Sequence, residues 1–180
     1  MKPKMQIQMS ANEYFFFLES IPCKETLLQP RHKVNSENAA EEYVAARDTW
    51  CREHWVEMDF DGLTLSEQTQ QLVYPVSRSR ALLRWEHDDV LEWFVRGPVE
   101  HFWAVQKGDR VNLSLVYGGF VMNRLQEELL QSPRGTLTSL CTADQQTMTT
   151  TLDSFSSDDQ GFSNAMEQQM QLYYRGIKNA

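Results

Sequence analysis

The stretch from residue 81 to residue 117 constrains the fold more than any other part of the sequence. It contains short segments rich in Val, Leu and aromatic residues: ALLRWE, DVLEWFVR, VEHFWAVQ and RVNLSLVY. Segments of this length and composition are typical of β-strands. Lys107–Asp109 suits a short hairpin loop, and Gly97-Pro98 marks a break where a strand can change direction. The pattern predicts an antiparallel β-meander over about residues 81–117.

Helical signals precede the meander. Ser10 and Glu13 have the spacing of a capping box, so a helix is expected to begin at Ser10. It should end before Pro22, because proline disfavours helical geometry in the residue before it. A loop over residues 23–36 follows. Beyond it we expect a helix-strand-turn-helix unit over about residues 37–80.

Capping and alternation signals define that unit. Asn35 or Ser36 is expected to cap its first helix, which carries a stripe of Ala, Tyr and Trp. Residues 56–60 alternate apolar and acidic side chains like a half-buried strand, and Asp61-Gly62 is a tight-turn signal. Thr64 begins a second capping-box spacing, so the next helix is expected to open there.

The C-terminal part is expected to be helical over about residues 118–176. An amphipathic helix is predicted from Phe120 to Leu130, and a final helix over residues 160–174. Between them we expect a strand or short helix at residues 137–140 and a helix near residues 144–152. The fold class is therefore α+β: an antiparallel β-meander of about four to five strands packed with N-terminal and C-terminal helices.

Composition narrows the class of protein. With 180 residues, 41% of them apolar, the chain is expected to form a single domain over residues 1–180. Its net charge of -8 disfavours nucleic acid as a partner. No apolar run approaches the roughly 20 residues that span a bilayer, and the stretch MKPKMQIQMS lacks the apolar core of a signal peptide. Three widely spaced cysteines suit reduced thiols. We expect a cytoplasmic protein without membrane insertion.

Candidate catalytic and metal-binding residues are few. Cys51 and His54 are three residues apart and suggest a thiol with its base, but Cys/His enzymes rarely assemble the pair from sequence neighbours. Glu57, Asp59 and Asp61 form an acidic strand edge without the spacing of a calcium loop. A structural cysteine and a solvated strand face are the favoured interpretations.

The cluster His87-Asp88-Asp89 offers groups for acid–base chemistry or metal binding, but its place between two predicted strands favours a polar hairpin loop. The sequence has no GxGxxG, GxxxxGK[ST], GxSxG or HExxH pattern. We therefore expect no enzyme activity, no catalytic residues, no metal and no cofactor.

Arg78, Arg80 and Arg84 form a local basic run after the helix-strand-turn-helix unit. Together they raise the alternative of a winged-helix-like DNA-binding regulator, with these side chains touching phosphates. The net negative charge argues against this alternative.

Adjacent aromatic residues occur on neighbouring strands of the meander: Trp93 with Phe94, and Phe102 with Trp103. Because successive side chains point to opposite faces, one of each pair should leave the main core unless both faces are covered. Large exposed aromatic side chains are enriched in interface hot spots. Trp93, Phe102 and Trp103 are therefore the predicted partner-binding residues.

Three stretches carry a family resemblance: QMSANEYFFFLESI, WVEMDFDGLTLSEQTQQLV and DVLEWFVRGPVEHFWAVQKGDRVNLSLV. In the order of its elements the chain resembles the EspG family of cytosolic chaperones and the EspG-like accessory proteins of type VII (ESX) secretion in Gram-positive bacteria. The resemblance implies a single EspG-like α+β domain. It further implies a non-enzymatic chaperone or adaptor that binds a helical secreted protein or heterodimer and keeps it soluble for export. A toxin-neutralising immunity protein is a further alternative, and no pattern in the sequence defines a homo-oligomer.

Overall fold

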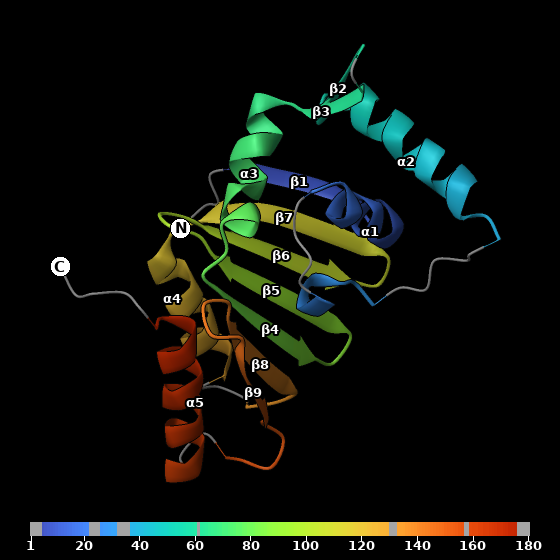
Figure 1. Ribbon diagram of the computed structural model, residues 1–180. Coiled ribbons are helices and arrows are strands. Elements are labelled where there is room, and N and C mark those ends of the chain that lie inside the picture. Colours follow the sequence, from blue (N-terminus) through green and yellow to red (C-terminus); the bar gives the residue numbers. More distant parts are fainter. Residues whose placement is uncertain are drawn as a thin grey trace.

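The computed structural model describes residues 5–21, 26–31, 37–60, 62–129, 133–156 and 159–175. Within these residues, helices cover both faces of a seven-stranded antiparallel sheet, and a two-stranded sheet lies beyond its edge (Figure 1). The expected α+β class, with helices before and after the strands, is confirmed.

The expected meander forms the centre of the large sheet, where four consecutive strands pair in chain order. An N-terminal strand extends one edge, and a C-terminal hairpin extends the other. The order across the sheet is β1-β7-β6-β5-β4-β8-β9, with the bounds β1 Met5–Ser10, β4 Ala81–His87, β5 Val90–Arg96, β6 His101–Lys107, β7 Arg110–Val116, β8 Thr136–Cys141 and β9 Gln146–Thr151.

Strand β1 was not predicted from the sequence. Its segment MQIQMS buries Ile7 and Met9 between exposed glutamines, which is the period of two expected for an edge strand with one covered face. Ser10 ends the strand and caps helix α1 (Ala11–Ser20). Its hydroxyl accepts from the amide of Glu13 at 3.1 Å, while the Glu13 carboxylate accepts from the amide of Ser10 at 2.7 Å. The predicted capping box is confirmed.

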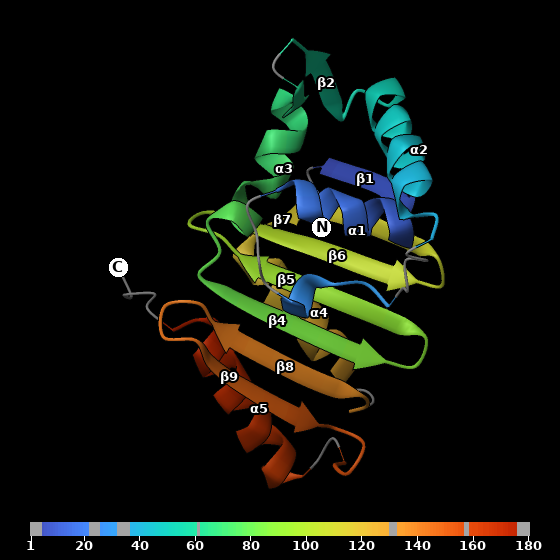
Figure 2. The same cartoon turned by 45° about the vertical axis from the view of Figure 1, so that its right-hand side comes forward.

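One face of the sheet is covered by α1 together with a 3-10 turn, η1 (Thr26–Leu28) (Figure 2). Trp93 of β5 lies at the centre of this layer. Its ring centroid is 5.4 Å from that of Tyr14, and its indole nitrogen donates to the carbonyl of Leu27 at 2.8 Å. Helices α2 (Ala39–Arg52) and α3 (Glu67–Ser77) add to the same core.

The predicted helix-strand-turn-helix unit is present as α2, β2 (Val56–Asp59), β3 (Gly62–Leu65) and α3. The expected start of the second helix at Thr64 is wrong. Thr64 pairs with Glu57 inside the β2–β3 hairpin, and Ser66 caps α3 instead by accepting from the amide of Thr69 at 3.4 Å. Backbone pairing with β2 therefore keeps Thr64 in the strand, and the helix begins after Ser66. The predicted caps at residues 35 and 36 lie outside the described residues.

The opposite face is covered by α4 (Gly118–Leu129) and α5 (Gln160–Tyr173), which Figure 2 shows behind the strands. Between these helices the chain forms the β8–β9 hairpin. The strand alternative for residues 137–140 is therefore correct, and the helix expected near residues 144–152 is wrong.

Strand pairing explains why residues 146–151 form a strand and not the expected helix. The segment QTMTTT of β9 alternates exposed and half-buried side chains, and its threonines are β-branched residues that favour strands. The hydroxyls of Thr138 and Thr149 lie 3.1 Å apart across the hairpin. Once β8 pairs with β4, its free edge offers backbone partners to this segment.

Gly135 at the start of β8 is predicted to tolerate no side chain. Its φ is +82°, and a Cβ atom there would lie 1.9 Å from the carbonyl oxygen of Glu86. We expect Gly135→Ala to lower the unfolding free energy by at least about 2 kcal/mol, measured by urea denaturation. The control is Gly119→Ala in α4, where a Cβ atom meets nothing within 4 Å. A neutral Gly135→Ala variant would show that the approach to β4 is not required.

Candidate functional site

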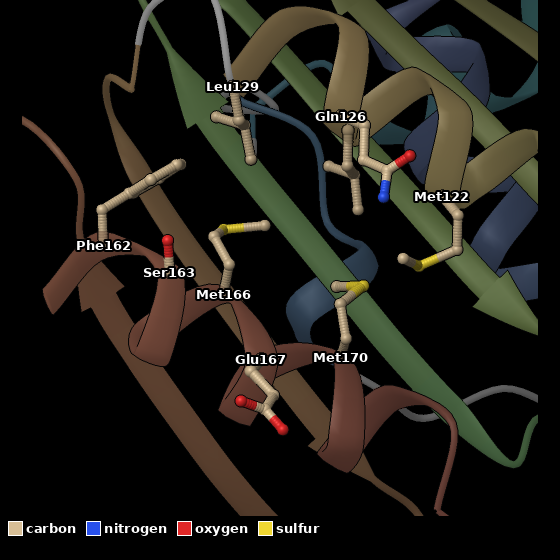
Figure 3. A pocket seen from close by; sticks show the side chains of 9 residues that line it. Met122, Gln126, Leu129, Phe162, Ser163, Met166, Glu167 and Met170 are labelled. Atoms are coloured by element: carbon tan, nitrogen blue, oxygen red, sulfur yellow. The ribbon is translucent and has the colours of Figure 1, made fainter. Parts of the chain in front are cut away.

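A groove of about 300 Å³ lies between α4 and α5 on the outer side of the second layer (Figure 3). Figure 3 shows Leu129 near Phe162 at one end and Met122 near Met170 at the other. The two helices therefore run in opposite directions along the groove. Apolar side chains form most of its wall, which comprises Met122, Leu125, Gln126, Leu129, Phe162, Ser163, Met166, Glu167 and Met170.

The spacing of residues along α4 and α5 determines which side chains face the groove. Val121, Leu125 and Leu129 recur at four-residue steps and are buried, so they form the inner stripe of α4. Met122 follows one position later and lies on the flank that faces α5. Along α5, Phe162, Met166 and Met170 also recur every four residues and share one flank. The groove is the space between these two flanks.

Different strands support the two helices. The main backbone contacts of α5 are with β8, and also with β4 and β9. The buried side chains of α4 share a core with Phe94 of β5 and Val116 of β7. The two helices thus have their main contacts with different parts of the sheet, and the flanks between them are only partly covered.

A buried carboxylate fixes α4 to the sheet. Glu92 of β5 is fully buried, and one of its oxygens accepts from Arg124 of α4 at 2.8 Å. The other oxygen accepts from the indole nitrogen of Trp103 at 2.9 Å, and His87 Nε2 lies 3.4 Å from the first. Burial alone would raise the pKa of Glu92, but the bonds from His87 and the charge of Arg124 hold that pKa below its ordinary value. Glu128 also pairs with Arg124.

Helix α5 is fixed by polar bonds at buried positions. The side-chain amide of Gln169 donates to the carbonyls of Leu137 and Met148, both at 3.2 Å, and to the Thr150 hydroxyl at 2.8 Å. These bonds tie one turn of the helix to both strands of the β8–β9 hairpin. These partners satisfy the amide nitrogen, whereas the buried side-chain oxygen of Gln169 has no hydrogen-bond partner among the described residues.

The last turn of α5 is joined to β6. A 2.7 Å hydrogen bond connects His101 Nδ1 and the hydroxyl of the fully buried Tyr173. Burial of His101, together with the charge of Arg96, lowers the pKa of the imidazole to about 4. The ring is therefore neutral near pH 7.

The structure separates the three predicted partner-binding residues. Trp93 is 0% exposed beneath the N-terminal helices, and Phe102, 1% exposed, belongs to the same core. Trp103 is half-buried on the opposite face, 4.7 Å from the ring of Phe120. Because helices cover both faces of the sheet, the described strands carry no patch of exposed aromatic side chains. The partly exposed apolar side chains lie instead on the two helices α4 and α5, where they line the groove.

The candidate catalytic residues are placed as follows. Helix α2 ends at Arg52, and His54 lies beyond it with a φ of 56°, so Cys51 and His54 do not share a helical face. His87 is buried, with its ring stacked on Trp85 at 3.8 Å. Glu57 is exposed on β2, and residue 61 lies outside the described residues. Among the described residues, no group of three or more His, Cys, Asp or Glu side chains is arranged to hold a metal ion.

The three arginines of the basic run, Arg78, Arg80 and Arg84, lie in different environments. Arg84 donates to Glu86 at 2.7 Å and to the carbonyls of Leu27 and Gln29, so its guanidinium fixes η1 to the sheet. Arg78 and Arg80 are exposed at the end of α3 and before β4. The DNA-binding alternative therefore depends on the latter two side chains.

Comparison with known proteins leaves the chain without a family assignment. No protein-family model matches it, and no curated protein matches its sequence. None of the helices in the described ranges has the length and apolar character needed to cross a membrane. The sequence does not predict the groove, because its signal there is modest: methionines at a four-residue spacing in the last helix.

Removal of the Glu92 charge is predicted to destabilise the protein. In Glu92→Gln the guanidinium of Arg124 loses its buried counter-charge, so we expect the unfolding free energy to fall by about 2 to 4 kcal/mol in urea denaturation. The matched control is Glu127→Gln on the exposed side of α4, which should change it by less than about 0.5 kcal/mol. Equal effects of the two variants would contradict a role for Glu92 in holding α4.

Acidification is predicted to weaken the protein through His101. Its folded-state pKa of about 4 lies below the ordinary value of 6.5, so protons bind the unfolded chain more readily as pH falls through this interval. We expect the His101 contribution to reduce the unfolding free energy by about 2 kcal/mol between pH 7 and pH 5. The charged or titratable groups around the ring are Arg96, Tyr173 and Tyr174.

The pH effect is tested by urea denaturation of His101→Gln at both pH values, with the exposed His54→Gln as control. The His101 variant should lose most of the difference between pH 7 and pH 5, and the His54 variant should keep it. An unchanged pH dependence in His101→Gln would assign the effect to other groups.

Proposed function

We propose that this protein is a non-enzymatic chaperone or adaptor that binds an amphipathic helix of a client in the groove between α4 and α5. The observation that carries this proposal is an open, elongated apolar groove between two antiparallel helices, with half-buried methionines on both walls. An amphipathic helix that places its apolar face into such a groove is a recurrent mode of peptide recognition.

The methionines favour a surface that adapts to its ligand. Met122, Met166 and Met170 are unbranched and flexible, and thioethers of this kind fill irregular contacts and are frequent at binding surfaces that accept several partners. Leu125, Leu129 and Phe162 are buried and supply a rigid base. A chaperone that receives more than one related client would use this combination.

Charge at the groove indicates the chemistry of the client. Glu167 lines the groove and is exposed, and Glu127 and Glu128 follow Gln126 along α4. Arg124, the basic residue of the same helix, is already bonded to Glu92 and Glu128. The chain as a whole carries a net charge of -8. A client helix with Lys or Arg beside its apolar stripe would complement this rim.

The EspG resemblance suggests the class of client. We infer a helical type VII secretion substrate, or a heterodimer of such proteins, that is kept soluble for export in the cytoplasm. In this role the groove covers an apolar face of the client that would otherwise associate with itself.

The groove can be tested through the methyl resonances of the methionines. The probe is a synthetic amphipathic helix with Leu at i, i+3, i+4 and i+7 and Lys at the flanks. We expect saturable shifts of the Met122, Met166 and Met170 methyl signals, because these side chains line the groove. The other five of the eight methionines are internal controls: Met1, Met5, Met9, Met58 and Met148.

Two variants complete the experiment. Met166→Asp places a charge in the apolar wall and should weaken peptide binding by at least about tenfold, whereas Gln168→Asp, on an exposed position of the same helix, should leave it unchanged. A peptide with the same composition but scrambled order should not bind. Shifts confined to methionines outside the groove, or none at all, would contradict the proposal.

A further inference from the structure

A second cavity of about 300 Å³ lies at one end of the sheet, apart from the groove. It collects residues from four places in the sequence, because the ends of adjacent strands meet there: Ala81 of β4 pairs with Arg96 of β5 on one side and with Cys141 of β8 on the other. The β8–β9 turn and Arg175, two residues beyond the end of α5, close the cavity. Its wall comprises Arg80, Arg96, Cys141, Thr142, Ala143, Asp144 and Arg175.

The wall has an excess of positive charge. It contains three arginines and one aspartate. Arg175 donates to Asp144 at 2.7 Å, so these two charges compensate each other. In the part of the chain that the structure describes, neither Arg80 nor Arg96 has a carboxylate partner. Two guanidinium charges therefore remain uncompensated around one cavity of a protein whose net charge is -8.

Arg96 is the more unusual of the two. Its side chain is only 3% exposed, and one terminal nitrogen donates to the carbonyl of Arg175 at 2.6 Å. Its Nε is buried and has no hydrogen-bond partner among the described residues. Burial lowers the pKa of Arg96, and the nearby charge of Arg80 acts in the same direction. A buried guanidinium with a free N–H and no counter-ion is costly unless an anion completes the site.

The other polar side chains of the wall, Thr142 and Asp144, already have hydrogen-bond partners, so Arg80 and Arg96 are the groups that could bind an anion. The Thr142 hydroxyl donates to the carbonyl of Ser79 at 2.8 Å, so its hydrogen is already used. The Asp144 carboxylate would repel an anion, but its pairing with Arg175 reduces that effect. A guanidinium presents parallel N–H donors that match the oxygens of a phosphate or carboxylate.

We propose that this cavity is a binding site for the oxyanion group of a small ligand, a phosphate monoester or a carboxylate, held by Arg80 and Arg96. The volume leaves space for a small organic part beside the oxyanion. The site is separate from the methionine groove, so it does not depend on the proposed function.

The test follows the Nε–Hε signals of the arginines by NMR while inorganic phosphate or acetate is added at ionic strength held constant with sodium chloride. Saturable shifts of the Arg96 Nε–Hε signal with either probe are expected, since Arg96 lines the cavity and this N–H has no partner among the described residues. Response to phosphate alone identifies a phosphate site, and a response to both identifies a general oxyanion site. No shift at Arg96 with either probe overturns the proposal.

Two variants separate the site from general surface attraction. Arg80→Gln should weaken phosphate binding by roughly five- to tenfold, because it removes one of the two uncompensated charges. The control is Arg78→Gln, which removes an exposed arginine two positions earlier that does not line the cavity. Because Arg80 is also exposed, the variant is expected to fold even if Arg96→Gln does not. Equal binding by the Arg80 and Arg78 variants would overturn the proposal.

Discussion

Strand β5 sends Trp93 to one face of the sheet and Phe94 to the other, and both side chains are fully buried. A sheet with large apolar side chains on both faces needs a layer of helices on each. The N-terminal helices cover the Trp93 face, and α4 and α5 cover the Phe94 face. This requirement explains why each face carries helices, but not where on that face each helix lies.

Helices α4 and α5 cover the Phe94 face of the sheet incompletely, because a groove remains between them. Polar contacts with the sheet define where these two helices lie. Glu92 is charged and fully buried within this layer, and Arg124 must remain near it. Gln169 similarly fixes α5 to β8 and β9. Two helices held at separate places by such directional bonds do not close onto each other as purely apolar helices would. The methionine groove is the consequence, and it gives the layer a surface suited to a third helix.

Helix α5 connects the two proposed sites. Met166 and Met170 line the groove along its length, and Arg175 after its last turn lines the arginine cavity. Between them, Tyr173 is bonded to His101 at the end of the sheet. One rigid element therefore positions an apolar surface and a cationic cavity at different distances along its axis.

The sequence alone determined the meander and α1, because the alternation at residues 81–117 and the capping box at Ser10 are local signals. It could not identify β1 or β9, whose polar and threonine-rich segments become strands only when a neighbouring edge supplies backbone partners. The same reason explains the sites. Adjacent aromatics revealed that both faces of the sheet carry apolar residues, but only the tertiary structure decided which helices cover them. The groove and the arginine cavity arise from residues far apart in the sequence, brought together by the pairing of strand ends and the spacing of two helices.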